Sequence, residues 1–325
     1  MLPVRALKRV RDPSNRRDAI AGPLKWQAVL LGKADSASVV FSKTGCALLA
    51  QLRANEAGAL ADQDPEYLHQ IRVTVRRLRA ILSLYSEPLG RRARKSVDRE
   101  LKWLAHALGP ARDSHVFMHD IWPPLRDVLD HGQWVETLNA EWLVQRRRNA
   151  RVAHRALSSQ RYRRMMHELE QWFSAQRWLE LATAGERMAW TRRARAFARR
   201  ELEYRAEHVR GYGRSLGDLD PEALHRLRIE IKKLRYMMDA LSSLFKRARV
   251  KKMLDALSNL QEILGELNDV AVAVQKIGET LPKKKSADLT QLRRQIADWQ
   301  VLRTKDLKRK LAAAWRAYRH VEPFW

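Results

Sequence analysis

Residues 65–82 read PEYLHQIRVTVRRLRAIL, and residues 221–238 read PEALHRLRIEIKKLRYMM. Seven of the 18 aligned pairs are identical, and the two segments lie 156 residues apart. A second pair keeps the same offset, because LKWLAHALGPARDSHV at 101–116 corresponds to LSNLQEILGELNDVAV at 257–272. An unbroken register across both windows indicates an internal duplication. We place the two halves at about 36–180 and 187–320.

Each repeat begins with signals for the start of a helix. Asp-Pro-Glu at 64–66 and at 220–222 places Asp at the N-cap, Pro at the first helical position and an acid in the first turn. Apolar residues then recur every three or four positions, which predicts a helix with one buried face. Gly109 and Gly265 are interpreted as helix ends or sites of close contact. Asp113 and Asp269 are then expected to cap the following helices.

The rest of the chain is also predicted to be helical. Ala, Leu, Arg and Glu dominate the long stretches between turn residues, and Gly and Pro are sparse, at 13 and 11 of 325 residues. Short connections between long helices favour antiparallel neighbours, so an all-α fold made of helical bundles is expected. Residues 1–35 are expected to form a basic N-terminal arm. Further helices are expected at 36–60, 92–108, 112–129, 133–155, 159–178, 187–210, 248–264, 268–278 and 287–320.

The strongest compositional feature is positive charge. Lys and Arg number 63 against 37 Asp and Glu, giving a net charge of +26, and the pI is about 10.8. Such an excess repels itself and favours a polyanionic partner, such as nucleic acid, an acidic membrane surface or another phosphate polymer. The alternative is the background of a basic proteome with no specific partner.

Two stripes of cations follow the repeat helices, with successive spacings of three, four and three residues that place each stripe along one line of a helix. The stripes consist of His69, Arg72, Arg76 and Arg79, and of His225, Arg228, Lys232 and Arg235. No acid within a stripe relieves the repulsion, whereas a bound anionic polymer would, through arginine forks and lysine point charges. The alternative is a set of solvated charges and packed histidines. One stripe alone would favour that alternative, but two in register favour a binding site.

The doubled element, LHQIRVTVRRLR with LGPARD and LHRLRIEIKKLR with LGELND, resembles the conserved histidine α-helical domain, abbreviated CHAD. The resemblance covers about residues 36–320. It implies two pseudo-symmetric, four-helix-type bundles with a basic groove or channel, and binding of inorganic polyphosphate, with granule association in some members. The implied ligand contacts are the two stripes, with Arg77, Lys233 and Arg112 as second-tier anion contacts. Asn268 stands where the first half has Arg112, which removes one positive charge from the second half.

Some members of that family also carry a triphosphatase domain of the CYTH type. The nearest string to its strand motif, ELEYR at 201–205, lies in a predicted helix, and the residues before 36 are too few for a barrel. We therefore expect a stand-alone binding domain with no cofactor and no enzymatic activity. A polyphosphate hydrolase is the enzyme alternative, and it would need clustered carboxylates for divalent metal ions. His115 and His119 beside Asp120 lack a counterpart in the second half and are interpreted as a chance pair.

Nucleic acid is the main alternative partner, because the same cations attract any phosphate backbone. The 11 tryptophans would suit base stacking, but most, such as Trp103, Trp142 and Trp172, fall at predicted core positions. A membrane surface and an acidic protein partner are weaker alternatives. The single cysteine, Cys46, excludes an internal disulfide. With no apolar run of about 20 residues, a cytoplasmic protein, on polyphosphate granules, is the expectation.

Further basic clusters occur outside the repeat windows. One group, on a predicted helix, contains Arg147, Arg148, Arg151 and Arg155. Another, near the C-terminal end, contains Lys305, Lys308, Arg309, Arg316 and Arg319. Charge runs of this kind are more often simply solvated, so we interpret both groups as extensions of the general positive field.

Overall fold

The computed structural model describes residues 22–129, 132–213, 216, 220–283 and 286–325, so most of the predicted N-terminal arm lies outside the described residues. Within these residues the regular elements are helices, apart from an isolated bridge between Ser36 and Arg193, which confirms the predicted all-α class. In chain order they are α1 (Ala37–Leu60), α2 (Pro65–Leu84), α3 (Ser86–Val116), η2 (Phe117–Ile121), α4 (Trp122–Arg126), α5 (Gln133–Ser158), α6 (Gln160–Ser174), η3 (Arg177–Glu180), α7 (Ala184–Thr191), α8 (Ala194–Tyr212), α9 (Pro221–Leu241), η5 (Ser242–Leu244), α10 (Arg247–Thr280) and α11 (Ala287–Arg319).

The repeat helices α2 and α9 begin as predicted. The Asp64 carboxylate accepts a hydrogen bond of 2.7 Å from the amide of Glu66, and the Asp220 carboxylate accepts one of 2.6 Å from the amide of Ala223. Each cap satisfies an amide that has no partner inside its helix. The proline that follows each cap lacks the N–H that would otherwise be left unpaired. Both helix starts are therefore fixed by local sequence.

The helix ends predicted at Gly109 and Gly265 are wrong, whereas the alternative of a close contact is confirmed at Gly109, where a Cβ atom would lie 3.2 Å from Arg72 Nη1. Helix α3 continues through Gly109 and helix α10 through Gly265, so neither glycine ends a helix. Asp113 and Asp269 consequently lie inside these helices and cap nothing. A glycine inside a helix costs only about 1 kcal/mol relative to alanine, and tertiary packing of long helices offsets such a cost.

The single helix predicted at 187–210 is also wrong. The chain there forms two helices, α7 and α8, because Arg192 and its neighbour leave the helical conformation. The Arg192 carbonyl instead accepts a hydrogen bond of 2.9 Å from the amide of Ala37, and the amide of Ala194 donates to the Asp35 carbonyl at 2.9 Å. Backbone pairing with a distant segment thus overrides the helical periodicity.

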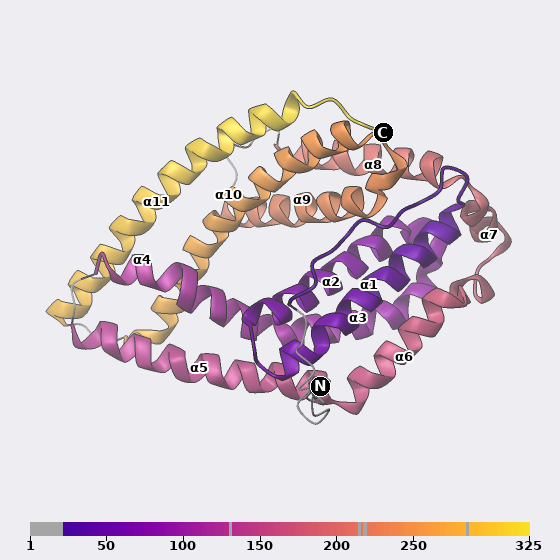
Figure 1. Ribbon diagram of the computed structural model, residues 1–325. Coiled ribbons are helices and arrows are strands. Elements are labelled where there is room, and N and C mark those ends of the chain that lie inside the picture. Colours follow the sequence, from indigo (N-terminus) through magenta and orange to yellow (C-terminus); the bar gives the residue numbers. More distant parts are fainter. Residues whose placement is uncertain (1–21, 130–131, 214–215, 217–219, 284–285) are drawn as a thin grey trace, which may run out of the picture.

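The main hydrophobic core is continuous across both predicted halves. Helices α2 and α9 pack against each other, and their buried faces belong to one cluster with the apolar faces of α1, α3, α8 and α10. A second, smaller cluster joins η2, α4 and α5 to α11 and the end of α10. Figure 1 shows that α5 and α11 form the long outer edges of this end of the molecule. None of the helices in the described part of the chain meets the length and hydropathy of a membrane span.

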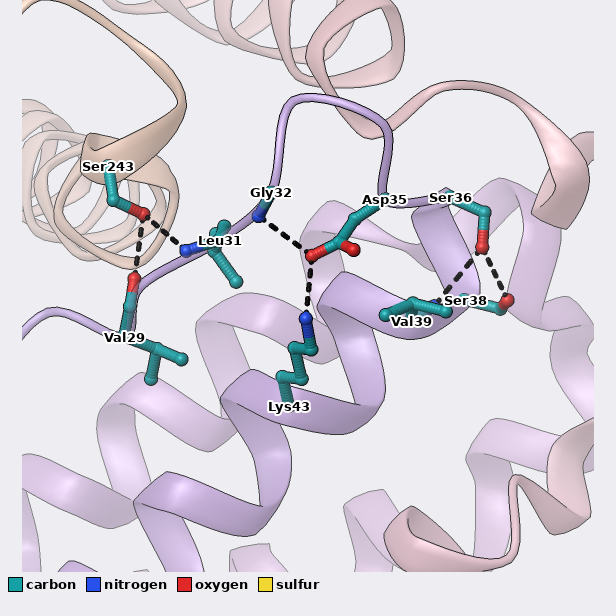
Figure 2. A network of polar contacts seen from close by, with 9 residues as sticks. All are labelled: Val29, Leu31, Gly32, Asp35, Ser36, Ser38, Val39, Lys43 and Ser243. Atoms are coloured by element: carbon teal, nitrogen blue, oxygen red, sulfur yellow. Dashed lines mark hydrogen bonds and ion pairs between the residues drawn. The ribbon is translucent and has the colours of Figure 1, made fainter.

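The described residues before α1 contact helices from both predicted halves. The amide of Leu24 donates to Asn55 Oδ1 of α1 at 3.0 Å. Further along, Ser243 Oγ of η5 donates to the Val29 carbonyl at 2.7 Å and accepts from the amide of Leu31 at 3.2 Å (Figure 2). This segment therefore joins α1 to the region that follows α9.

Candidate anion-binding site

Helices α2, α3 and α9 together line a pocket with a volume of about 560 Å³. Its cations come from all three helices, and Asp98 of α3 is the acidic residue among its lining side chains. The cations are Arg76, Arg79, Arg94, Lys102, Arg228, Lys232 and Lys233. The structure therefore brings parts of both predicted stripes into one place.

Sequence reasoning missed two of these cations, Arg94 and Lys102. Arg94 lies outside the matched windows and Lys102 lies inside the second one, but the positions 156 residues later hold Val250 and Ser258, so a search for duplicated charges finds neither cation. Arg94, Asp98 and Lys102 follow one another at intervals of four residues, which places all three on one face of a helix. This spacing is the signal that the sequence offers. The Asp98 carboxylate lies 2.7 Å from Lys102 Nζ and 3.7 Å from Arg79 Nε, so it neutralises part of the charge on that wall.

Arg76 lies where the two stripes approach each other. Burial is the main cause that lowers the pKa of His69, Arg72 and Lys232, and the positive charge of Arg76 lowers each of them further. Arg76 acts on the pKa of Arg228 in the same direction. A single guanidinium that influences cations on both α2 and α9 indicates that the two stripes form one electrostatic unit.

Lys232 is affected both by burial and by this crowding of charges. Burial, followed by the charges of Arg228 and Arg76, lowers its pKa to about 7, although Asp269 opposes the shift. In the free protein the ammonium is thus partly deprotonated at neutral pH. An anion in the pocket would favour the charged form and raise the pKa of Lys232 again.

Arg72 is buried, with 8% of its surface exposed, and it does not line the pocket. Its Nη2 donates to Asp113 Oδ1 at 2.8 Å. Burial lowers its pKa to about 10, an effect that Asp113 opposes, so the guanidinium remains charged at neutral pH. Its counterpart Arg228 also has a pKa lowered by burial, and the charge of Asp269 opposes that shift.

The two stripe histidines differ. His69 is half-buried, and burial followed by the charge of Arg112 lowers its pKa, so the neutral imidazole predominates at neutral pH in the free protein. His225 is exposed, and its Nδ1 lies 3.0 Å from Oδ1 of Asn268. Asn268 stands at the position of Arg112 in the second half. It lacks the positive charge of Arg112 but forms a hydrogen bond with the histidine.

The remaining predicted residues lie at the edges of the site. Arg235 Nε donates to Gln261 Oε1 at 2.9 Å, and Arg235 is not among the residues that line the pocket. Arg77 is buried and pairs with Asp239 of α9, with its guanidinium 5.1 Å from the ring centroid of Tyr236. That position favours a structural role for Arg77 over contact with an anion. Lys233 lines the pocket and pairs with Glu230 at 2.6 Å.

The geometry can be compared with known proteins. The CHAD domain family model matches residues 45–278. The chain belongs to the CHAD domain family. No CYTH domain is matched. The CHAD domain of the plant Ricinus communis, solved as a crystal structure, is 26% identical with a TM-score of 0.77, covering 93% of this chain and 98% of that one.

Other proteins are similar to this CHAD protein at lower identity or over a shorter part of the chain. PptA from Streptomyces chartreusis has a TM-score of 0.62 at 15% identity, over 87% of this chain and all of that one, which shows a shared fold. Uncharacterized proteins from two strains of Mycobacterium tuberculosis, CDC 1551 and H37Rv, are each 35% identical over 175 residues. These alignments cover 52% of this chain, but only 33% of each relative's length.

The histidine pair predicted to be a chance pair lies outside the pocket of the CHAD domain. The rings of His115 and His119 stack at 5.6 Å between centroids, and His119 Nδ1 lies 2.8 Å from the Asp120 carboxylate. Among the residues that the structure describes, no group of three or more His, Cys, Asp or Glu side chains is arranged to hold a metal ion.

Proposed function

We propose that this CHAD-domain protein binds inorganic polyphosphate in the pocket between α2, α3 and α9. The observation that carries the proposal is the convergence of both predicted stripes, with Arg76 and Arg79 from α2 and Arg228 and Lys232 from α9 lining one pocket. Polyphosphate carries charge at short, regular intervals along a flexible chain. Cations from several helices around one pocket suit such a chain, because arginine and lysine can contact successive phosphates.

The proposed site also extends beyond the pocket along α2. The charge of Arg112 lowers the pKa of both His69 and Arg72, and the charge of Arg76, which lines the pocket, acts on both in the same direction. We propose that they continue a basic groove along α2, in which a longer polyphosphate chain extends past Arg76. Binding would raise the pKa of His69 and add its positive charge to the groove.

Nucleic acid remains the second candidate ligand, and exposed arginines on α5 favour it. Arg147, Arg148 and Arg151 lie at the surface, where a wide, stiff duplex can reach them. Stacking of bases has less support, because Trp122 and Trp142 are almost fully buried. Competition between the two ligands separates these candidates.

The test is a titration with long-chain polyphosphate, with single- and double-stranded DNA as competitors, at near-physiological salt. Changing four pocket cations that have no buried ion pair to Ala should weaken polyphosphate binding by at least tenfold and reduce its salt dependence. These cations are Arg76, Arg94, Lys102 and Lys232. The matched control removes the same charge from α5, at Arg147, Arg148, Arg151 and Arg155.

The control variant should bind polyphosphate within about threefold of the wild type, because its four arginines do not line the pocket and salt screens exposed charges. Equal losses in the two variants would mean that only total charge matters. Tighter binding of DNA than of polyphosphate would favour the nucleic-acid alternative.

We further propose that binding occurs without catalysis and directs the protein to polyphosphate granules. Long-chain polyphosphate incubated with the protein and Mg²⁺ should release no orthophosphate above background. In cells, a fluorescent fusion should co-localise with granules, and the pocket variant should lose that pattern. Steady phosphate release that disappears in the pocket variant would instead show a hydrolase.

A further inference from the structure

The second repeated motif, LGPARD in the first half and LGELND in the second, does not end a helix. Gly109 and Asp113 lie four residues apart within α3, and Gly265 and Asp269 lie four residues apart within α10. This spacing places each glycine and its aspartate on one face of the helix, one turn apart. Both faces are directed toward an arginine on the neighbouring repeat helix.

In the first half, the guanidinium of Arg72 occupies the surface of α3 beside the glycine. A Cβ atom at Gly109 would lie 3.2 Å from Arg72 Nη1, closer than ordinary van der Waals contact. One turn later, Asp113 Oδ1 accepts a hydrogen bond of 2.8 Å from Arg72 Nη2. The glycine therefore provides space for the guanidinium, and the aspartate holds one edge of it.

The second half has the same glycine and aspartate, but the described contact of the Asp269 carboxylate is with Asn268 Nδ2, at 3.4 Å, and not with Arg228. A Cβ atom at Gly265 would lie 3.9 Å from Arg228 Nη2, which is an ordinary contact distance. The charge of Asp269 favours the protonated form of Arg228, and burial raises the pKa of Asp269 while Arg228 lowers it. The two side chains therefore interact electrostatically across α9 and α10.

We propose that the Gly-x-x-x-Asp element of α3 is a cradle that positions Arg72 to receive phosphate, with Gly109 providing space for the guanidinium and Asp113 holding one edge of it. This inference rests on the proposed function. Asp113 is a positioning residue, since it acts on the ligand through Arg72.

The arginine side chain is long and loses much rotamer entropy when it is fixed. A cradle that fixes it beforehand removes this entropy loss from the binding step. A carboxylate that accepts from one edge fixes the plane of the guanidinium and leaves its other N–H donors available to an anion. The side chain of Asp113 is 70% exposed, so the restraint lies at the surface where a ligand would arrive. The arginine is thus oriented before the phosphate binds.

Asp113 can affect binding through its negative charge or through its hold on Arg72, and these two explanations predict different effects of substitution. Because a carboxylate repels phosphate, an explanation by charge alone predicts that Asp113→Ala and Asp113→Asn both tighten polyphosphate binding. The cradle predicts that they differ, because asparagine keeps an accepting oxygen and alanine does not. We expect Asp113→Ala to weaken polyphosphate binding about tenfold, and Asp113→Asn to bind as tightly as wild type or more tightly.

The second measurement asks whether Asp113 acts through Arg72. In an Arg72→Ala background, Asp113→Ala should no longer weaken polyphosphate binding, because there is no guanidinium left to position. A denaturant titration of each variant, without ligand, identifies losses of binding that come from unfolding. If Asp113→Ala weakens binding equally in both backgrounds, the positioning role is wrong.

Glycine substitutions provide a test in which the net charge stays constant. Gly109→Ala should displace Arg72 and weaken polyphosphate binding about fivefold, whereas Gly265→Ala should change it by less than twofold. Gly278→Ala in α10 is the control, because nothing outside its own stretch of helix lies within 4 Å of the place that a Cβ atom would take. Equal effects at positions 109 and 278 would overturn the proposal. If the wild-type protein itself does not bind polyphosphate, the proposed function fails. If it does, and the Asp113 variants bind alike, only the cradle fails.

Discussion

Helices α2 and α9 carry the same pattern of cations, but they hold those cations with different partners. On α2, Arg72 is paired with Asp113 at 2.8 Å and Arg79 lies 3.7 Å from Asp98. At the position equivalent to Arg79, Arg235 of α9 instead donates to the neutral side chain of Gln261. The first stripe is therefore partly neutralised before any ligand arrives.

The second stripe contributes the less compensated charge. Burial, followed by the charges of Arg228 and Arg76, lowers the pKa of Lys232 to about 7, against the opposing charge of Asp269. Equivalent positions have thus taken different roles. The first half supplies arginines that are already held in place, and the second half supplies a lysine whose charge depends on the ligand.

The largest expected difference between the halves is in the unfolding free energy that is lost when Arg77 or its counterpart Lys233 is replaced. Arg77→Ala leaves Asp239 without its partner in a largely buried position and should cost about 3 kcal/mol of unfolding free energy. Lys233→Ala removes a more exposed pair within one helix and should cost less than about 1 kcal/mol. Urea unfolding measures both. Similar costs would contradict the structural role assigned to Arg77.

The next difference concerns cations that have no counterpart in the other half. We expect Arg94→Ala combined with Lys102→Ala to weaken polyphosphate binding about tenfold, or about 1.4 kcal/mol, because both line the pocket. The control, Arg249→Ala with Lys252→Ala, removes two exposed charges from α10 and should change binding by less than about twofold. Calorimetric titration at fixed salt measures both. A larger loss in the control would place the site elsewhere.

The third prediction uses the titration of Lys232. Its pKa of about 7 in the free protein means that binding requires proton uptake above neutral pH, so affinity should fall as pH rises from 7 to 8.5, by about threefold to tenfold. Arginine stays charged throughout this range, so Lys232→Arg should flatten the profile. Long polyphosphate chains have few terminal phosphates, so the titration of those groups contributes little to the pH profile. A wild-type profile that the substitution does not change would exclude Lys232 as the titrating group.

Lys232 should also affect stability, with the opposite sign. Its folded-state pKa lies below that of the unfolded chain, so the unfolded state binds more protons between pH 7 and about 10. Its contribution should therefore favour folding as pH rises through this window. Lys232→Met removes the buried charge and should raise stability at pH 7 by about 1 kcal/mol while it weakens binding. Destabilisation by this variant would contradict the assigned electrostatic cost.

The smallest expected effect tests the exchange of Arg112 for Asn268. Asn268→Arg should tighten polyphosphate binding about twofold at low salt, because the added charge outweighs the lost hydrogen bond to His225. Arg112→Asn should weaken binding by a similar factor. Fluorescence anisotropy at two salt concentrations measures both changes. If only Arg112→Asn has an effect, the ligand follows the first half alone.

Local sequence was sufficient for several features. The caps at Asp64 and Asp220, the apolar faces of α2 and α9, and the existence of the stripes depend on residues a few positions apart, which the sequence places on one helix face. The CHAD resemblance also followed from these motifs, and the family match confirms it. The roles of the stripe residues, and the duplication itself, remain predictions.

Tertiary structure decided which of these cations meet. Arg76 and Lys232 come together because α2 packs against α9, and Arg94 and Lys102 join them from α3. It also placed Arg77 in a buried ion pair, and it extended α3 and α10 through glycines that favour a helix end by local criteria. Helix periodicity depends on neighbouring residues, so a sequence can display it. Burial, ion pairing and pKa depend on contacts between distant segments, and these exist only in the folded chain.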